Sequence, residues 1–165
     1  MTGPSAQPTE RSRQKADRRA QLMQMSARLF ADRGFGAVSM EELGGAAGVS
    51  GPALYKHFRS KQHLLAELLV GVSRRLLEGG REVADLSGTG ERALRSLVAF
   101  HTDFALSEPE LIRLQERDLV HLAPEDRSTV RRLQRSYVEM WVSILSRVRA
   151  EMAAGEARIR VHAVF

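Results

Sequence analysis

The stretch Ser39–Phe58 reads SMEELGGAAGVSGPALYKHF and carries the start and stop signals of two short helices. Ser39 and Glu42 have the spacing of a capping box, in which each side chain accepts a hydrogen bond from the backbone of the other residue. Apolar residues at helical spacing follow, and Gly48 supplies a stop. The first half of the stretch is therefore predicted to form a short, capped helix.

The second half repeats this arrangement. Ser50 is an N-cap residue, and Pro52 lies in the first turn, where its missing N–H costs nothing. Leu54 and Phe58, four residues apart, face the core. Two helices joined by a short turn containing glycine form a helix-turn-helix, which places its second helix in the major groove of DNA.

Longer amphipathic helices are predicted on both sides of this pair. The upstream helix begins at about Ala16 and ends at Gly34, and the downstream helix is capped by Ser60 and interrupted by Gly79–Gly80. Their apolar stripes consist of Leu22, Met25, Ser26, Leu29 and Phe30 upstream, and of Leu64, Leu65, Leu68, Leu69, Val72 and Leu76 downstream.

The rest of the chain also has helical periodicity. Ser107–Glu110 repeats the capping-box spacing, and Gly155 is expected to close the last helix. The one candidate strand is Ile159–Phe165, so the predicted class is all-α. The remaining predicted helices are about 91–106, 109–122 and 125–153.

Residues 1–15 are polar and contain two prolines, which predicts a disordered basic arm. Two interpretations of its Arg11, Arg13 and Lys15 stay open: contact with an adjacent phosphate, or a solubilising tail.

The net charge of +5 lies entirely in the first 63 residues, which hold ten basic and five acidic side chains. Residues 64–165 hold fifteen of each. A basic segment joined to a neutral one indicates a polyanion-binding part and a part with another task.

Several classes of protein are excluded by what the sequence lacks. It has no cysteine, no run of 18 apolar residues and no apolar signal-peptide core, which favours a cytoplasmic protein. It has no phosphate-binding glycine loop and no nucleophile elbow, so neither an enzyme nor a cofactor is expected. Its five histidines include no i,i+4 pair, and a structural role is favoured over a metal site.

Three segments carry a family resemblance: Leu22–Gly36 (LMQMSARLFADRGFG), Ser39–Ser50, and Gly51–Leu65 (GPALYKHFRSKQHLL). Over about residues 16–76 the chain resembles the N-terminal domain of TetR-type transcriptional regulators. The resemblance implies a three-helix DNA-binding domain over 16–76, with its motif at 39–58, and a helical ligand-binding and dimerisation domain over 77–165.

The resemblance also implies a set of DNA contacts. Ser39, Tyr55, His57 and Lys61 match positions that contact phosphates, and Lys56 is expected to reach guanine O6 and N7. Gly51 and Pro52 match positions that approach the base edges, and their lack of large side chains would let the backbone come close. The full predicted set is Ser39, Ser50, Gly51, Pro52, Ala53, Tyr55, Lys56, His57 and Lys61.

Other interpretations of single residues remain. Tyr55 can also be a packing residue with a solvated hydroxyl, and His57 an ordinary surface or core histidine. Met40 stands where a polar contact residue is frequent in the family, so no base contact is expected from it. Glu41 and Glu42 are interpreted as capping groups.

The second domain mixes large apolar residues with a few polar ones, a composition that suits an effector pocket between helices. The alternative is that they form ordinary bundle core. The resemblance implies a pocket here without identifying its lining. The candidate lining residues are Phe100, His101, Phe104, Gln115, Leu119, Tyr137 and Trp141.

The predicted function is that of a ligand-controlled repressor, a homodimer on a pseudo-palindromic DNA operator, released by a small, apolar effector. Repression rather than activation follows from the resemblance alone. The alternatives are an architectural DNA-binding protein without sequence preference and an all-α small-molecule-binding protein.

The family forms its dimer through two C-terminal helices of each subunit. This chain stops at Ile159–Phe165 without a capping signal. The expectation is a truncated chain or a shortened dimerisation end.

Overall fold

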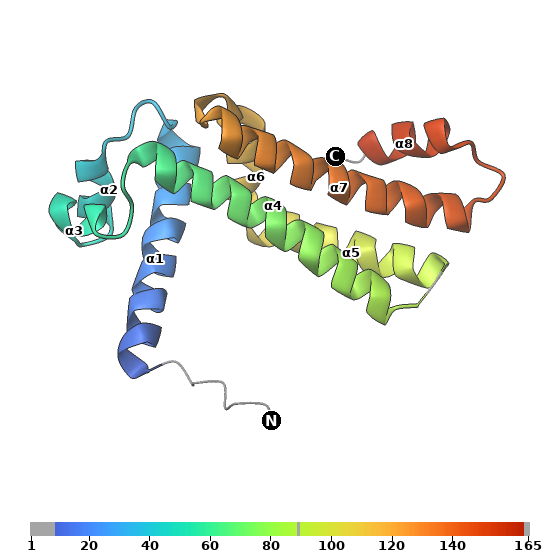
Figure 1. Cartoon of the computed structure of the whole chain (residues 1–165), viewed down its shortest axis with the longest axis horizontal. Helices are drawn as coiled ribbons and strands as arrows, with labels where there is room; N and C mark the ends of the chain where they lie inside the picture. The colour runs from blue at the N-terminus through green and yellow to red at the C-terminus, as the bar shows by residue number, and fades with distance from the viewer. Residues whose placement is uncertain (1–8, 89, 164–165) are drawn as a thin grey trace. The chain divides into compact units, whose positions relative to one another are not determined.

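The computed structural model describes residues 9–88 and 90–163, and over these residues it contains eight α-helices, one 3₁₀-helix and no strand (Figure 1). The predicted all-α class is confirmed. The chain divides into two compact units, the first ending at Leu64 and the second beginning at Leu65. This division and the domain boundary predicted after residue 76 both fall within one helix, α4 (Lys61–Leu86).

The first unit consists of α1 (Glu10–Arg33), α2 (Met40–Ala46), α3 (Gly51–Tyr55) and the start of α4. Large apolar side chains from all four helices, from the α1–α2 loop and from the α3–α4 connection fill its core. The fully buried ones are Leu22, Phe30, Val38, Leu43, Leu54, Phe58 and Leu64.

Helix α1 begins earlier than predicted, at Glu10 rather than near Ala16. Thr9 caps it, because the Thr9 hydroxyl accepts from the backbone N–H of Ser12, and Glu10 places a carboxylate in the first turn. The prediction of a disordered arm was therefore wrong for residues 10–15, which are helical. Residues 1–8 of that arm lie outside the described residues.

The second unit contains most of α4 together with α5 (Glu91–Ser107), α6 (Pro109–Arg117), the 3₁₀-helix η1 (Leu119–His121), α7 (Pro124–Val148) and α8 (Ala154–His162). Figure 1 shows α8 turning back along α7. The core of this unit includes Leu97, Leu114, Val130, Tyr137, Trp141 and Ile144.

Gly79 and Gly80 do not interrupt α4, contrary to the sequence interpretation. A Cβ atom added at Gly79 would lie 2.6 Å from the ring of Phe100, and one at Gly80 would lie 2.8 Å from the ring of Tyr137. The two glycines therefore allow α5 and α7 to pack closely against α4. Tertiary packing offsets their low helix propensity.

Two predicted helix ends and one candidate strand differ from the structure. Ser107 forms no capping box, because its hydroxyl donates back to the carbonyl of Phe104, and α6 begins after Glu108 without a side-chain cap. Gly155 lies inside α8 instead of closing the preceding helix, which ends at Val148. The candidate strand from Ile159 is helical as far as His162.

The last residues, 164–165, are not described. Ala157 and Val161, four residues apart on one face of α8, are buried, so the residues read as a strand instead follow helical spacing.

Candidate nucleic-acid interface and ligand cavity

The start of α2 is fixed by the predicted capping box. The Ser39 hydroxyl accepts from the backbone of Glu42 at 3.1 Å, and the Glu42 carboxylate accepts from the backbone of Ser39 at 2.8 Å. Arg33 from α1 donates to the same carboxylate at 2.9 Å. The hydrogen bond from the Ser39 backbone, aided by the Ser39 hydroxyl and Arg33, lowers the pKa of Glu42 below its usual 4.5.

The turn between α2 and α3 passes close to α2. A Cβ atom on Gly44 would lie 3.0 Å from the carbonyl oxygen of Val49, and Gly48 has a φ of +64°, which favours glycine. The Ser50 hydroxyl then accepts from the backbone N–H of Ala53, as predicted. The two glycines thus set the short connection that a helix-turn-helix requires.

Helix α3 has one buried and one exposed face. Leu54, and Phe58 just beyond the helix, are completely buried, whereas Tyr55 is 49% exposed and Lys56 is exposed beside it. Among the other predicted contact residues, Ser39, Ser50 and Pro52 are exposed, and Gly51 and Ala53 are half-buried. The predicted residues of α3 therefore share the side of the helix that its core contacts leave open.

Lys61, at the first position of α4, lies in a different environment. Its ammonium donates to the carbonyls of Phe35 at 2.8 Å and Val38 at 2.7 Å, and it lies 4.5 Å from the ring centre of Phe35. Two of its three hydrogens are thereby used within the protein. Lys61 holds the α1–α2 loop that leads into the Ser39 cap, a role that the sequence analysis missed.

Two arginines of α1 brace the motif from the other side. Arg18 donates to the carbonyl of Ala47, at the C-cap of α2, and the Arg19 guanidinium lies 4.6 Å from the ring centre of Phe58. The sequence alone indicates only the positive charge of these two residues. Their spacing from the apolar stripe of α1, one helical turn before Leu22, was the available signal.

His57 is half-buried next to Phe58. Its Nδ1 atom is buried and, within the described part of the chain, has no hydrogen-bond partner. The other ring nitrogen, Nε2, is therefore the atom left to make the predicted phosphate contact.

The second unit contains a cavity of about 420 Å³ between α4, α5, α6 and α7. Three of the predicted pocket residues, His101, Gln115 and Tyr137, line it. Helical spacing offered a signal for Ala105, Ile112 and Gln134, which lie three or four positions from them. The lining residues missing from the prediction also include neighbours one position away and two residues of α4. The full missing set is Ser73, Leu76, Ala105, Ile112, Glu116, Gln134 and Val138.

The other four predicted pocket residues are not part of the lining. The Phe100 ring lies over Gly79, Phe104 is buried, and Leu119 is half-buried in η1. Trp141 is buried behind the lining, with its ring centre 5.9 Å from that of His101 and 6.1 Å from that of Tyr137. It thus contacts two lining rings from behind.

The cavity contains two pairs of polar side chains. The amide nitrogen of Gln115 donates to the hydroxyl of Ser73 at 2.8 Å, and that hydroxyl donates to the carbonyl of Leu69. The Nδ1 atom of His101 lies 3.2 Å from the hydroxyl of Tyr137. Burial lowers the pKa of His101 and raises the pKa of Tyr137 to about 12, so both rings are uncharged at neutral pH.

Residues 9–88 and 90–163 include no group of three or more His, Asp or Glu side chains placed to hold a metal ion. None of the helices in these ranges is long and apolar enough to cross a membrane.

Comparisons with known proteins agree with this arrangement. A family model described as bacterial regulatory proteins, tetR family, matches residues 22–68, and one described as tetracyclin repressor-like, C-terminal domain, matches residues 87–165. The repressor KstR2 of Rhodococcus jostii is 31% identical over 147 residues, covering 88% of this chain and 70% of that protein.

Two further similarities concern a second curated relative and a solved structure. The activator FasR of Mycolicibacterium smegmatis is 35% identical over 98 residues, which span 59% of this chain and 45% of that protein. The structure of the ketosteroid regulator KstR2 of Mycobacterium tuberculosis matches with a TM-score of 0.79 at 22% identity, covering 89% of this chain and 79% of that one. The first unit's helix-turn-helix, the cavity-bearing helical unit and these similarities together show that the chain belongs to the TetR family of bacterial transcriptional regulators.

Proposed function

We propose that this chain is a ligand-responsive repressor that binds a pseudo-palindromic DNA operator as a homodimer and leaves the operator when a small molecule fills the cavity of the second unit. The observation that carries the proposal is the exposed face of α3, with Tyr55 and Lys56 projecting from a motif whose backbone is capped at Ser39 and Ser50.

Each DNA contact follows from the chemistry of its side chain. Lys56 donates to guanine O6 and N7 in the major groove, and the Tyr55 hydroxyl donates to a phosphate. The Ser39 hydroxyl accepts from Glu42, so its own hydrogen is directed to a phosphate. His57 uses Nε2. The third ammonium hydrogen of Lys61 is the one left for the phosphate contact predicted there.

Gly51, Pro52 and Ala53 carry small side chains at the start of α3, and Ser50 caps it. We propose that they let the backbone approach the base edges closely. Direct sequence reading is then concentrated in Lys56, and the remaining contacts position the helix.

The dimer and the direction of regulation rest on family membership. In the simplest arrangement, two copies of α3 enter successive major grooves about 34 Å apart. Repression is favoured over activation because the KstR2 match covers more of this chain than the FasR match does. An operator-binding protein of a bacterium acts in the cytoplasm, where the DNA is.

Helix α4 provides a route for release. It begins with Lys61, which holds the loop before α2, and it carries Ser73 and Leu76 at the cavity. A ligand that favours one conformation of α4 shifts the DNA-binding equilibrium by the difference between its affinities for the two conformations.

The test begins with selection of an operator from random DNA, followed by binding to that operator and to a scrambled duplex across a salt series. The expected result is tighter binding of the operator, with two chains per palindrome. Equal affinity for both duplexes would instead indicate an architectural DNA-binding protein.

Variants then locate the interface. Tyr55→Ala and Lys56→Ala should each weaken operator binding, whereas Gln62→Ala, at an exposed position of α4 close to the motif, serves as the matched control. Unchanged binding by both α3 variants would count against the proposal.

A further inference from the structure

Among the described residues, none that lines the cavity of the second unit is a lysine or an arginine. Its lining combines four aliphatic side chains and the uncharged groups of Ser73, Gln115, Gln134 and Tyr137 with His101 and one carboxylate, Glu116. Burial keeps the His101 ring neutral. Glu116 is exposed, so the one formal charge of the lining lies where the cavity meets solvent.

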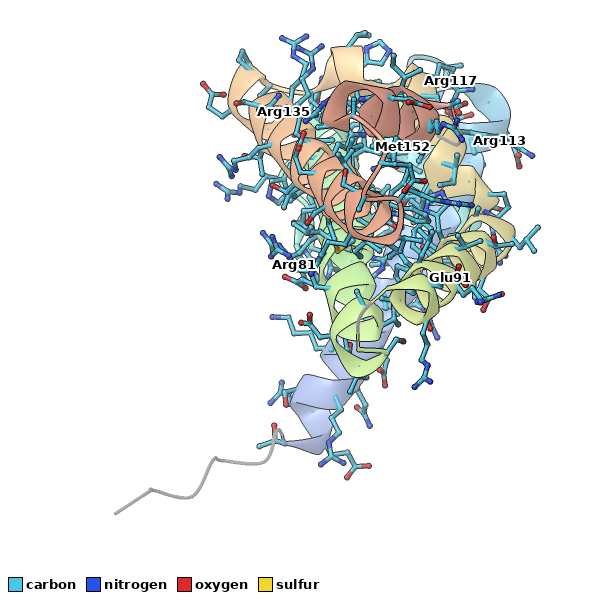
Figure 2. All side chains as sticks on the ribbon, turned by 90° about the vertical axis from the view of Figure 1, so that its right-hand side faces the viewer. Arg81, Glu91, Arg113, Arg117, Arg135 and Met152 are labelled. Carbon is cyan, nitrogen blue, oxygen red and sulfur yellow. The ribbon has the colours of Figure 1, made fainter. Side chains whose placement is uncertain are left out.

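This lack of positive charge is particular to the cavity. Residues 64–165 contain fifteen arginines, and three of them, Arg81, Arg132 and Arg135, line a separate open hollow between α4 and α7. Figure 2 labels Arg81 and Arg135, which project from those two helices. The second unit thus has many arginine side chains, but none of them lines the cavity.

The polar groups inside the cavity are arranged for neutral hydrogen bonding. Ser73 is 2% exposed and holds one amide hydrogen of Gln115. Within the described part of the chain, the other amide hydrogen and the amide oxygen of Gln115 make no hydrogen bond. Both are therefore free to pair with a ligand that can donate or accept a single hydrogen bond.

We propose that the cavity selects an uncharged, largely apolar ligand with a hydroxyl or carbonyl group that pairs with Gln115, and that it rejects the carboxylate of the same skeleton. A buried carboxylate would find no counter-charge here and would face Glu116, whereas a hydroxyl or carbonyl loses little when it enters. This inference rests on the proposed function only where it calls the ligand an effector.

Trp141 makes the selection measurable. It is the only tryptophan of the chain, it is buried, and it packs edge-on against the rings of His101 and Tyr137. A ligand that touches these two rings should change the emission of Trp141. Binding can therefore be followed in the full chain without DNA.

The experiment compares three probes with the same alkyl chain: 1-decanol, decanoate and decyltrimethylammonium, each titrated at pH 7.5 below its aggregation concentration. The expected result is saturable binding of 1-decanol, with decanoate weaker by at least about tenfold because its charge would be buried unpaired. Equal or tighter binding of decanoate or of the cation would overturn the proposal, as would no response to any probe.

Variants assign the selectivity to residues. Gln115→Leu should weaken 1-decanol binding by about fivefold to tenfold, the size of one lost hydrogen bond. Gln134→Lys should convert the cavity to one that binds decanoate, while Glu110→Gln, on α6 but outside the lining, should change nothing. If Gln134→Lys leaves the preference for 1-decanol intact, charge does not determine the choice.

The proposed function and this inference fail separately. If the protein shows the expected probe selectivity but no preference for an operator, the inference about the cavity stands and the proposed repressor function is wrong. If the protein binds its operator specifically but prefers decanoate, the proposed function stands and the inference about the cavity is wrong.

Discussion

The two units of this chain use their side chains in different ways. In the first unit, the hydroxyls of Ser39 and Ser50 accept hydrogen bonds from the backbone, and Lys61 donates two to it. These bonds fix the backbone around α2 and α3, and the exposed face of α3 stays open. In the second unit, the cavity comes from amphipathic positions on four helices, and Ser73 and Gln115 contribute its polar interior. If the proposed function holds, recognition of a large, charged partner depends on the backbone position of α3, whereas recognition of a small one depends on the chemistry of the cavity lining.

The largest expected effect is a loss of stability in the first unit that leaves the second unit folded. Phe58 is completely buried in the first unit, so Phe58→Ala should destabilise it by about 3–5 kcal/mol and abolish operator binding. Chemical denaturation and the Trp141 response to 1-decanol measure the two units in one sample. Tyr55→Ala is the control that loses operator binding but keeps stability. If Phe58→Ala also abolishes the Trp141 response, the units unfold together.

The second prediction concerns packing around the cavity. In Gly80→Ala, the added Cβ would lie 2.8 Å from the Tyr137 ring and from the end of Met140, and overpacking of this kind costs about 1–3 kcal/mol. Gly71→Ala is matched on the same helix, where the nearest atom is 3.9 Å away, and it should stabilise by up to about 1 kcal/mol. Thermal unfolding should therefore show opposite signs. Equal shifts in one direction would contradict the close packing at Gly80.

The third prediction separates bracing from DNA contact within the first unit. Lys61→Met leaves the carbonyls of Phe35 and Val38 without their donor and should cost about 1–3 kcal/mol of stability. Lys56→Met should leave the free energy of unfolding unchanged, weaken operator binding and alter the sequence preference. The assignment of Lys61 as a brace would be wrong if its substitution affected DNA binding alone.

The smallest expected effect is a difference between the two units in the pH at which each begins to lose stability. The folded pKa of His101 lies below the ordinary 6.5, so the second unit should begin to lose stability as the pH falls below about 6.5. The folded pKa of Glu42 lies below 4.5, so its contribution is complete above that pH and is lost only at lower values.

Unfolding measured from pH 8 to pH 3 in His101→Gln and Glu42→Gln checks the order of these two losses. Each variant should flatten its own part of the profile. The assignment fails if His101→Gln leaves the slope between pH 6.5 and pH 5 unchanged.

Local signals in the sequence were sufficient for the helix-turn-helix. The capping box at Ser39, the cap at Ser50 and the buried positions Leu54 and Phe58 all act within a few residues, and the structure confirms each of them. The resemblance to the family was recognised on residues that include this stretch, and the family models extend the similarity to residues 87–165.

Features that depend on distant partners were not predictable in this way. Gly79 and Gly80 look like a helix break until the rings of Phe100 and Tyr137 are packed against them. Likewise, Lys61 resembles a phosphate contact until the carbonyls of Phe35 and Val38, more than twenty positions away, are seen to bind it. The mixture of apolar and polar residues identified three cavity residues, His101, Gln115 and Tyr137, but which residues line a cavity between four helices depends on how those helices pack.

The setting of Lys61 has a consequence for chemical labelling. The chain has three lysines, Lys15, Lys56 and Lys61, and all of them lie in the first unit. Among the side chains of the printed sequence, an amine-reactive reagent therefore modifies only lysines of the first unit. Lys15 and Lys56 are exposed and should react quickly, whereas Lys61 reacts only when its two hydrogen bonds open. The acylation rate of this one amine is thus a direct measure of how often the loop before α2 comes loose.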